Sequence, residues 1–130
     1  MAMADDIAGK CVLVTGAGTG IGRGIAFKFA DYGADVVLHY GHSGDGAKSA
    51  AAEIEQMGRR AIALQADFEE VDEVFRLAGE AEDFLGRVDV LINNSGITTN
   101  IPYANVLPKQ FDTLFNVNIR AMYFITQAVA

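Results

Sequence analysis

Apolar residues along this chain fall into two alternating patterns: short continuous runs, and longer stretches with apolar positions three and four apart. Continuous runs are typical of strands buried on both faces, whereas the three-four spacing is typical of helices. The runs predict four strands, at residues 10–15, 35–40, 60–66 and 88–93. The spaced stretches predict four helices, at residues 21–31, 47–57, 69–85 and 110–130.

The regular alternation of strand and helix indicates right-handed crossover connections and a parallel sheet, and therefore an α/β fold. Glycines 33, 58 and 86 mark the ends of the first three helices. The residues at 41–46 predict a turn, and those at 94–108 a loop that holds both prolines. The apolar spacing predicts these helix faces: Ile21, Ile25 and Phe29; Ala47, Ala50, Ile54 and Met57; Val71, Val74, Ala78, Ala81 and Leu85.

The final predicted helix is apolar over an unusually large part of its surface. Such a helix is buried on more than one side, and this chain offers cover for only one. We therefore expect another subunit, in a homo-oligomer, or further chain to cover the other side. Its two apolar stripes are Phe111, Phe115, Asn118, Met122, Ile125 and Val129, and Leu114, Val117, Ala121, Phe124 and Ala128.

Composition narrows the range of partners. The chain has 130 residues, 51% of them hydrophobic, which suffices for one domain with its own core. A net charge of −7 argues against a nucleic-acid or anionic-membrane surface and favours simple solubility. No apolar run approaches a membrane span, and the first ten residues lack the apolar core of a signal peptide.

The cysteine and histidine content bears on the cellular compartment, on disulfide formation and on metal binding. The single Cys11 excludes an internal disulfide and fits a reducing compartment, so we expect a cytoplasmic protein. Cys11 begins an apolar strand, which predicts an inert buried thiol. His39 and His42 lack a third ligand nearby, so we expect no metal site.

The glycine-rich stretch at residues 12–22 runs from an apolar strand into a turn and then a helix. We expect Gly16 to allow the tight turn, Gly20 to let the backbone approach a pyrophosphate, and Gly22 to let the helix pack on the strand. The phosphates would bind at the helix N-terminus, where free N–H groups and the helix dipole favour anions. The spacing G-x-x-x-G-x-G differs from the common G-x-G-x-x-G, and no Gly-Lys-Ser/Thr follows.

Polar residues follow two further strands. Asp67 ends the third strand at the carboxyl edge of the sheet, where it could accept a hydrogen bond from an adenine amino group; the alternative is a cap for the next helix. Asn94 and Gly96 are candidates for the cofactor cleft, whereas Asn93 is expected to tie loops together.

Asn118 stands in an apolar stripe of the final helix. An unpaired amide there would cost roughly 1–3 kcal/mol, so a polar partner or a catalytic water is expected. The alternative is a core asparagine with satisfied hydrogen bonds.

Four motifs together resemble the short-chain dehydrogenase/reductase family. Residues 15–22 match its Thr-Gly-x-x-x-Gly-x-Gly, and Asp67 matches its adenine-ring aspartate. Residues 93–96 match its Asn-Asn-Ala-Gly with Ser for Ala, and Asn118 matches the asparagine of its active-site tetrad. Similar members include 3-oxoacyl-carrier-protein reductases and glucose 1-dehydrogenases.

The resemblance implies a Rossmann-type doubly wound parallel sheet, incomplete here, with about four strands in the order 3-2-1-4. It implies NAD(P)-dependent hydride transfer between nicotinamide and a small-molecule carbonyl or secondary alcohol. Asn118 would be catalytic, supporting a water-linked proton relay. The cofactor-binding residues would be Gly16, Gly18, Thr19, Gly20, Ile21, Gly22, Tyr40, His42, Ser43, Asp67, Phe68, Asn94, Ser95 and Gly96.

The choice between NAD and NADP depends on the end of the second strand. Asp35 lies about 20 residues beyond the glycines, as a ribose-binding acid would, but it begins that strand. The strand ends in His-Tyr-Gly-His-Ser without a carboxylate, which favours NADP. His42 and Ser43 could hold the 2′-phosphate, or could form a solvated turn. NAD stays possible, because Thr19 occupies a place that is often basic in NADP-preferring relatives.

The serine and the Tyr-x-x-x-Lys of the family are missing from this sequence. The residues four places after Tyr32, Tyr40, Tyr103 and Tyr123 are Val36, Gly44, Leu107 and Gln127. We therefore expect residues 1–130 to be one dinucleotide-binding domain, truncated within the helix that carries Asn118 and inactive alone. The alternatives are a non-catalytic dinucleotide-binding module and one half of a split protein.

Overall fold

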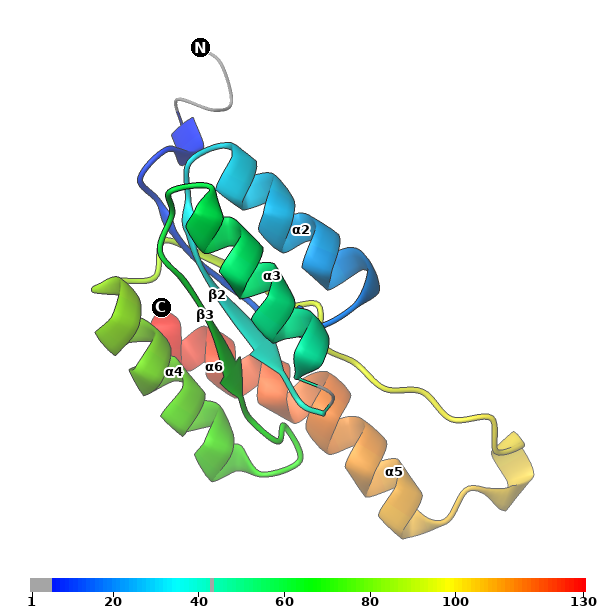
Figure 1. Cartoon of the computed structure of the whole chain (residues 1–130). Coiled ribbons are helices and arrows are strands. Elements are labelled where there is room, and N and C mark those ends of the chain that lie inside the picture. The colour runs from blue at the N-terminus through cyan, green and yellow to red at the C-terminus, as the bar shows by residue number, and fades with distance from the viewer. Residues whose placement is uncertain (1–5, 43) are drawn as a thin grey trace.

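The computed structural model describes residues 6–42 and 44–130, and these form a four-stranded parallel sheet between two layers of helices (Figure 1). The strands are β1 (Cys11–Val14), β2 (Asp35–Tyr40), β3 (Ala61–Gln65) and β4 (Val90–Ile92). Their order is β3-β2-β1-β4, with every pairing parallel. The sequence-based prediction of fold class and strand order is confirmed.

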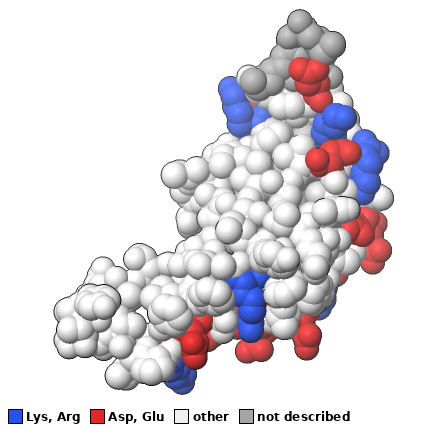
Figure 2. Space-filling model, turned by 180° about the vertical axis from the view of Figure 1, so that it is seen from behind, with Lys and Arg blue, Asp and Glu red and all other residues white. Residues whose placement is uncertain are grey.

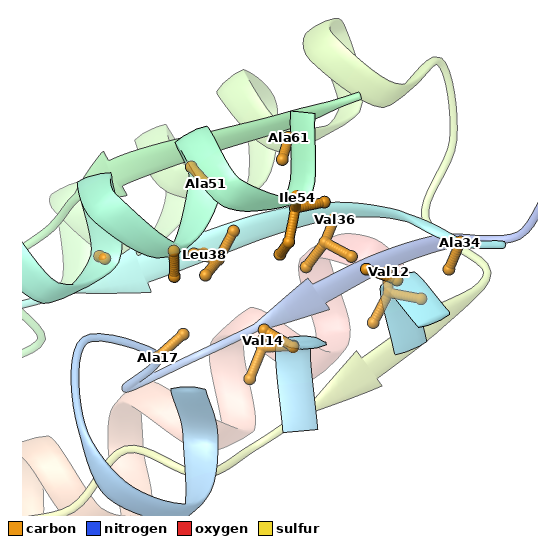
Figure 3. Close-up of a cluster of buried hydrophobic side chains, with 13 residues drawn as sticks. Val12, Val14, Ala17, Ala34, Val36, Leu38, Ala51, Ile54 and Ala61 are labelled. Carbon is orange, nitrogen blue, oxygen red and sulfur yellow. The ribbon is translucent and has the colours of Figure 1, made fainter. Parts of the chain in front are cut away.

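The helices divide between the two faces of the sheet. Helices α2 (Gly20–Asp31) and α3 (Asp45–Gln56) pack on one face, and α4 (Val71–Leu85) and α6 (Ala121–Val129) pack on the other (Figure 1). Each face of the sheet has its own hydrophobic core. Alternate residues of a strand contribute to different cores, because successive side chains point to opposite faces. Figure 3 shows the first core, where Val36 and Leu38 of β2 meet Ile54 of α3. In the second, Leu13 and Val37 pack with Ile125.

Two of the residues assigned to helix faces turn out to be exposed. Ile21 is 76% exposed, because α2 packs on the sheet through Gly22, Ala26 and Ala30, one position further along. These small residues bring the helix backbone close to β1, which an isoleucine could not do. Met57 is 38% exposed, because α3 ends at Gln56 and Met57 is already its C-cap.

The final helix is interrupted, against the expectation of one continuous α-helix over 110–130. It consists of α5 (Pro108–Phe115), a π-helical turn η2 (Asn116–Arg120) and α6. A π turn inserts an extra residue, and such turns are frequent at functional sites. The preceding loop contains a short 3₁₀ turn η1 (Tyr103–Asn105), and the loop and α5 project from the rest of the chain (Figure 1).

The final helix is only partly covered, as its two apolar stripes suggested. Ala121 and Ile125 are buried against α4, whereas Ile119, Met122 and Tyr123 are 44–64% exposed. Viewed from behind, at the β4 edge of the sheet, the molecule has a broad face without Lys, Arg, Asp or Glu (Figure 2). No helix among the described residues is long and apolar enough to cross a membrane.

Candidate cofactor site

The glycine-rich turn joins β1 to α2 and has the backbone geometry that its glycines require. Gly16 and Gly20 have φ angles of +62° and +54°, in the left-handed region that favours glycine. A Cβ on Gly22 would lie 2.2 Å from the carbonyl oxygen of Gly16. The predicted roles of Gly16 in the turn and of Gly22 in close packing are therefore confirmed. Gly20 has no atom within 4 Å of its Cβ position, so that side of the turn is open.

The N-terminus of α2 faces this turn without an acidic or capping side chain. Thr19 is the N-cap, its hydroxyl makes no capping hydrogen bond, and the first turn of α2 contains no acid. The first N–H groups of a helix lack intrahelical partners and, with the helix dipole, attract anions. This arrangement suits the binding of a phosphate group.

A cavity of about 740 Å³ opens at the carboxyl edge of the sheet, where open α/β sheets bind their ligands. Its volume lies in the range usual for small-molecule sites. The predicted site residues that line it are Gly16, Thr19, Gly20, Ile21, His42, Asp67, Phe68, Asn94, Ser95 and Gly96. It is also lined by His39, Gly41, Ala66, Ile97 and Val117, which sequence reasoning did not assign to the site.

Four of the predicted site residues that the structure describes are not in this lining. Gly18 belongs to the turn, but its carbonyl oxygen lies against Gly46 at the start of α3, where a Cβ on Gly46 would clash with it. Tyr40 packs its ring against Gly44 instead of facing the cavity. Gly22 and Asn118 do not line the cavity themselves but contact residues that do: Gly22 packs against Gly16, and Asn118 is hydrogen-bonded to Ile97. The prediction for Ser43 lies outside the described residues.

The hydroxyl of Thr15 joins the glycine-rich turn to the segment after β4. Its Oγ1 accepts hydrogen bonds from the backbone N–H groups of Asn94 and Ser95, each at 3.0 Å. The Asn94 side chain in turn donates from Nδ2 to the Gly16 carbonyl oxygen at 3.0 Å. Thr15 stands in the quoted motif, yet its role in joining β1 to β4 could not be read from spacing.

Asp67 lies at the cavity wall and does not cap the next helix. The N-cap of α4 is Glu70, so the capping alternative for Asp67 is wrong. Its Oδ1 accepts a hydrogen bond from the Glu69 N–H at 2.9 Å, which fixes the turn after β3. The N–H of Asp67 donates to Glu73 Oε1 at 3.0 Å, and this bond lowers the pKa of Glu73.

His39 is the main site residue that sequence reasoning missed. It is only 2% exposed, and its ring stacks on Phe68 with centroids 4.1 Å apart. Nδ1 accepts a hydrogen bond from the Gly16 N–H at 3.0 Å, and Nε2 lies 3.0 Å from the Ala66 carbonyl oxygen. Burial lowers the pKa of His39 from 6.5 to about 4, so the ring is neutral near pH 7.

The two ends of β2 differ as the sequence suggested. Asp35 lies at the amino end, beside Cys11 of β1, and forms an ion pair with Arg60 at 3.0 Å. It therefore lies at the opposite end of the strand from the cavity. At the carboxyl end, His42 lines the cavity. Among the described residues, no group of three or more His, Cys, Asp or Glu could hold a metal ion.

Asn118 lies in the π turn and holds the segment after β4. Its Oδ1 accepts from the Ile97 N–H and its Nδ2 donates to the Ile97 carbonyl oxygen, both at 2.8 Å. The prediction of a polar partner for this amide is confirmed. Asn93 donates from Nδ2 to Thr126 Oγ1 at 3.0 Å, so it ties the segment after β4 to helix α6, whereas the sequence predicted a link between loops.

Comparison with known proteins identifies the class. Residues 10–130 match the model of the short chain dehydrogenase family. The chain therefore belongs to the short-chain dehydrogenase family, as its four motifs indicated.

Individual relatives share much of this sequence. A hydroxynaphthalene reductase-like protein, Arp2, from Metarhizium majus is 44% identical over 93% of this chain and 45% of its own length. An L-rhamnose 1-dehydrogenase (NAD(P)(+)) from Sphingomonas is 41% identical over 94% of this chain and 48% of its own. The chain thus spans about half the length of the curated relatives it matches.

Solved structures share the fold over nearly the whole chain. A short chain dehydrogenase from Burkholderia cenocepacia in complex with NADP has a TM-score of 0.92 and 38% identity. It matches 95% of this chain and 50% of its own. A blue fluorescent protein from a metagenomic library, in complex with NADPH, has a TM-score of 0.90, 36% identity, and coverage of 95% and 51%.

Proposed function

We propose that this chain is the cofactor-binding part of an NADP-dependent oxidoreductase that acts on a small-molecule carbonyl or secondary alcohol. The observation that carries the proposal is the cavity at the carboxyl edge, where the glycine-rich turn, the Asp67 loop and the segment after β4 meet. A bound nicotinamide dinucleotide would supply the hydride; the protein would supply orientation and a path for the proton.

The chain's own groups fit such a cofactor. The open side of Gly20 and the uncapped start of α2 suit a pyrophosphate, which needs close backbone approach and N–H donors. The carboxylate of Asp67 suits an adenine amino group, with Phe68 forming the adjacent wall. Asn94, Ser95 and Gly96 would border the ribose and nicotinamide.

The preference for NADP is supported by the end of β2. The sequence from Tyr40 to Gly44 contains no carboxylate that would repel a 2′-phosphate, and His42 lines the cavity there. The structural relatives described above were solved with NADP and NADPH. We propose that His42 and Ser43 border the 2′-phosphate.

Asn118 is proposed to act near the reacting groups by supporting a water-linked proton relay. Both polar atoms of its amide hold the Ile97 backbone, so it also fixes the segment that would face the nicotinamide. The family's serine and Tyr-x-x-x-Lys are not in this sequence, so the domain at 1–130 would act together with further chain. The exposed face of the final helix suits assembly into a homo-oligomer. The single buried thiol suits the cytoplasm.

Titration of the complete protein with NADPH and NADH, followed by nicotinamide fluorescence, tests the cofactor assignment. We expect NADPH to bind more tightly, and clearly tighter binding of NADH would refute the preference. Oxidation of NADPH in the presence of a panel of ketones and aldehydes tests the reaction. Binding without turnover of any substrate would instead favour a non-catalytic binding module.

Replacing Asn118 with alanine in the complete enzyme should lower turnover more than it lowers NADPH affinity. The variant loses the amide that holds Ile97, whereas the glycine-rich turn keeps its contacts. Wild-type turnover in this variant would assign Asn118 to structure alone.

A further inference from the structure

We propose that His39 is a positioning residue for the cofactor. Its ring aligns the carboxyl ends of the strands so that the glycine-rich turn and the cavity wall of Asp67 and Phe68, proposed above for adenine, face one ligand. The inference rests on the proposed function and deepens it. His39 would not touch the reacting atoms; it would act through the turn that binds the pyrophosphate.

His39 contacts segments that follow each of the other three strands. Gly16, which follows β1, donates its N–H to Nδ1, and Ala66, which follows β3, has its carbonyl oxygen 3.0 Å from Nε2. The Ser95 hydroxyl, which follows β4, lies 3.4 Å from Nδ1. These partners are 23, 27 and 56 residues away in sequence, so one side chain sets the relative positions of distant segments.

The partners also determine the state of the ring. Because Gly16 offers an N–H, Nδ1 must be the acceptor, and Nε2 then carries the hydrogen that is donated to Ala66. Neutral imidazole with the proton on Nε2 meets both requirements, and imidazolium would place an N–H against the Gly16 N–H. The other ionisable side chains that line this cavity in the described residues are Asp67 and His42.

The turn has little freedom to compensate for loss of the ring. Gly16 is already in the left-handed region, and a Cβ on it would lie 3.1 Å from both Cα and Oγ of Ser95. The N–H of Ala17 is fixed as well, donating to the His39 carbonyl oxygen at 2.8 Å. Without an acceptor at Nδ1, the partly buried Gly16 N–H would lose its hydrogen-bond partner. Other conformations of the turn would then be favoured, and binding would have to restore the correct one.

The test separates this role from core packing by using variants that keep different parts of the ring. His39→Asn keeps an acceptor near the position of Nδ1, His39→Gln keeps a donor near that of Nε2, and His39→Phe keeps the stacking on Phe68 alone. Val37→Ala is the matched control, because Val37 is buried in the same strand and the same core but makes no bond to the turn. The Kd of NADPH and the thermal midpoint of the complete protein would be measured for all four.

We expect His39→Gln and His39→Phe to weaken NADPH binding about tenfold, as for one partly buried donor left unpaired. His39→Asn should stay within about threefold of the wild type, and Val37→Ala should lower the thermal midpoint with an unchanged Kd. Equal NADPH affinity in the wild type and in folded His39→Gln would overturn the proposal, as would equal weakening in the Asn and Gln variants. A wild type that binds neither NADPH nor NADH would instead refute the proposed function.

Discussion

Replacing Gly22 with alanine should destabilise the protein, whereas the same change at Gly24, two residues along the same helix, should stabilise it. A Cβ on Gly22 would lie 2.2 Å from the Gly16 carbonyl oxygen and 2.4 Å from Asn94 Nδ2. A Cβ on Gly24 would have no atom within 4 Å. Both glycines are helical, so the gain in helix propensity is the same, and only the contacts differ.

The contacts determine the size of the difference. Forcing a methyl group into a packed site costs about 1–3 kcal/mol, and displacing Asn94 from the Gly16 carbonyl oxygen costs about 1 kcal/mol more. The helix gains about 1 kcal/mol when glycine becomes alanine. Gly22→Ala should therefore lose about 1–3 kcal/mol, and Gly24→Ala should gain up to about 1 kcal/mol.

Urea unfolding of the two variants and the wild type measures these free energies, with unchanged m-values showing that only stability has changed. NADPH titration of the same samples is the second measurement, since the displaced turn is the proposed pyrophosphate site. A Gly22→Ala protein as stable as Gly24→Ala would refute the close packing of α2 on the turn.

Two further predictions follow from buried groups. Because burial lowers the pKa of His39 from 6.5 to about 4, the unfolded chain binds a proton that the folded one excludes, and the free energy of unfolding falls as pH falls through this window. The contribution of His39 to the free energy of unfolding should drop by about 2 kcal/mol from about pH 7 to about pH 5. The free energy measured by urea unfolding should therefore depend more steeply on pH for the wild type than for His39→Asn. The Cys11 thiol, 1% exposed, should react with a thiol reagent at least about a hundredfold more slowly in the folded protein than in urea; since it is the only cysteine, fast labelling of the native protein would contradict its burial.

The candidate site was predictable to the extent that its residues follow strands. Gly16, Asp67 and Asn94 were found because each stands just after a predicted strand, and parallel strands bring their carboxyl ends to one edge. Tyr40, the last residue of its strand, was assigned to the site on similar grounds but packs on Gly44, because position along a strand does not say which neighbour a ring will contact. His39 was considered only as a metal ligand, since a single histidine in an apolar run carries no signal of its hydrogen bonds.

The sequence by itself determined the alternation of strands and helices, the parallel sheet and the glycine-rich turn, because hydrophobic period and turn chemistry are local properties. The tertiary structure decided which face of each helix is buried, and it did so through fit: Gly22 rather than Ile21 packs against the glycine-rich turn, since only a small residue allows the close approach. It also decided the π turn at Asn118 and the bonds of His39. Those features depend on partners more than twenty residues away, whose positions are set only when the sheet and both helix layers have packed together.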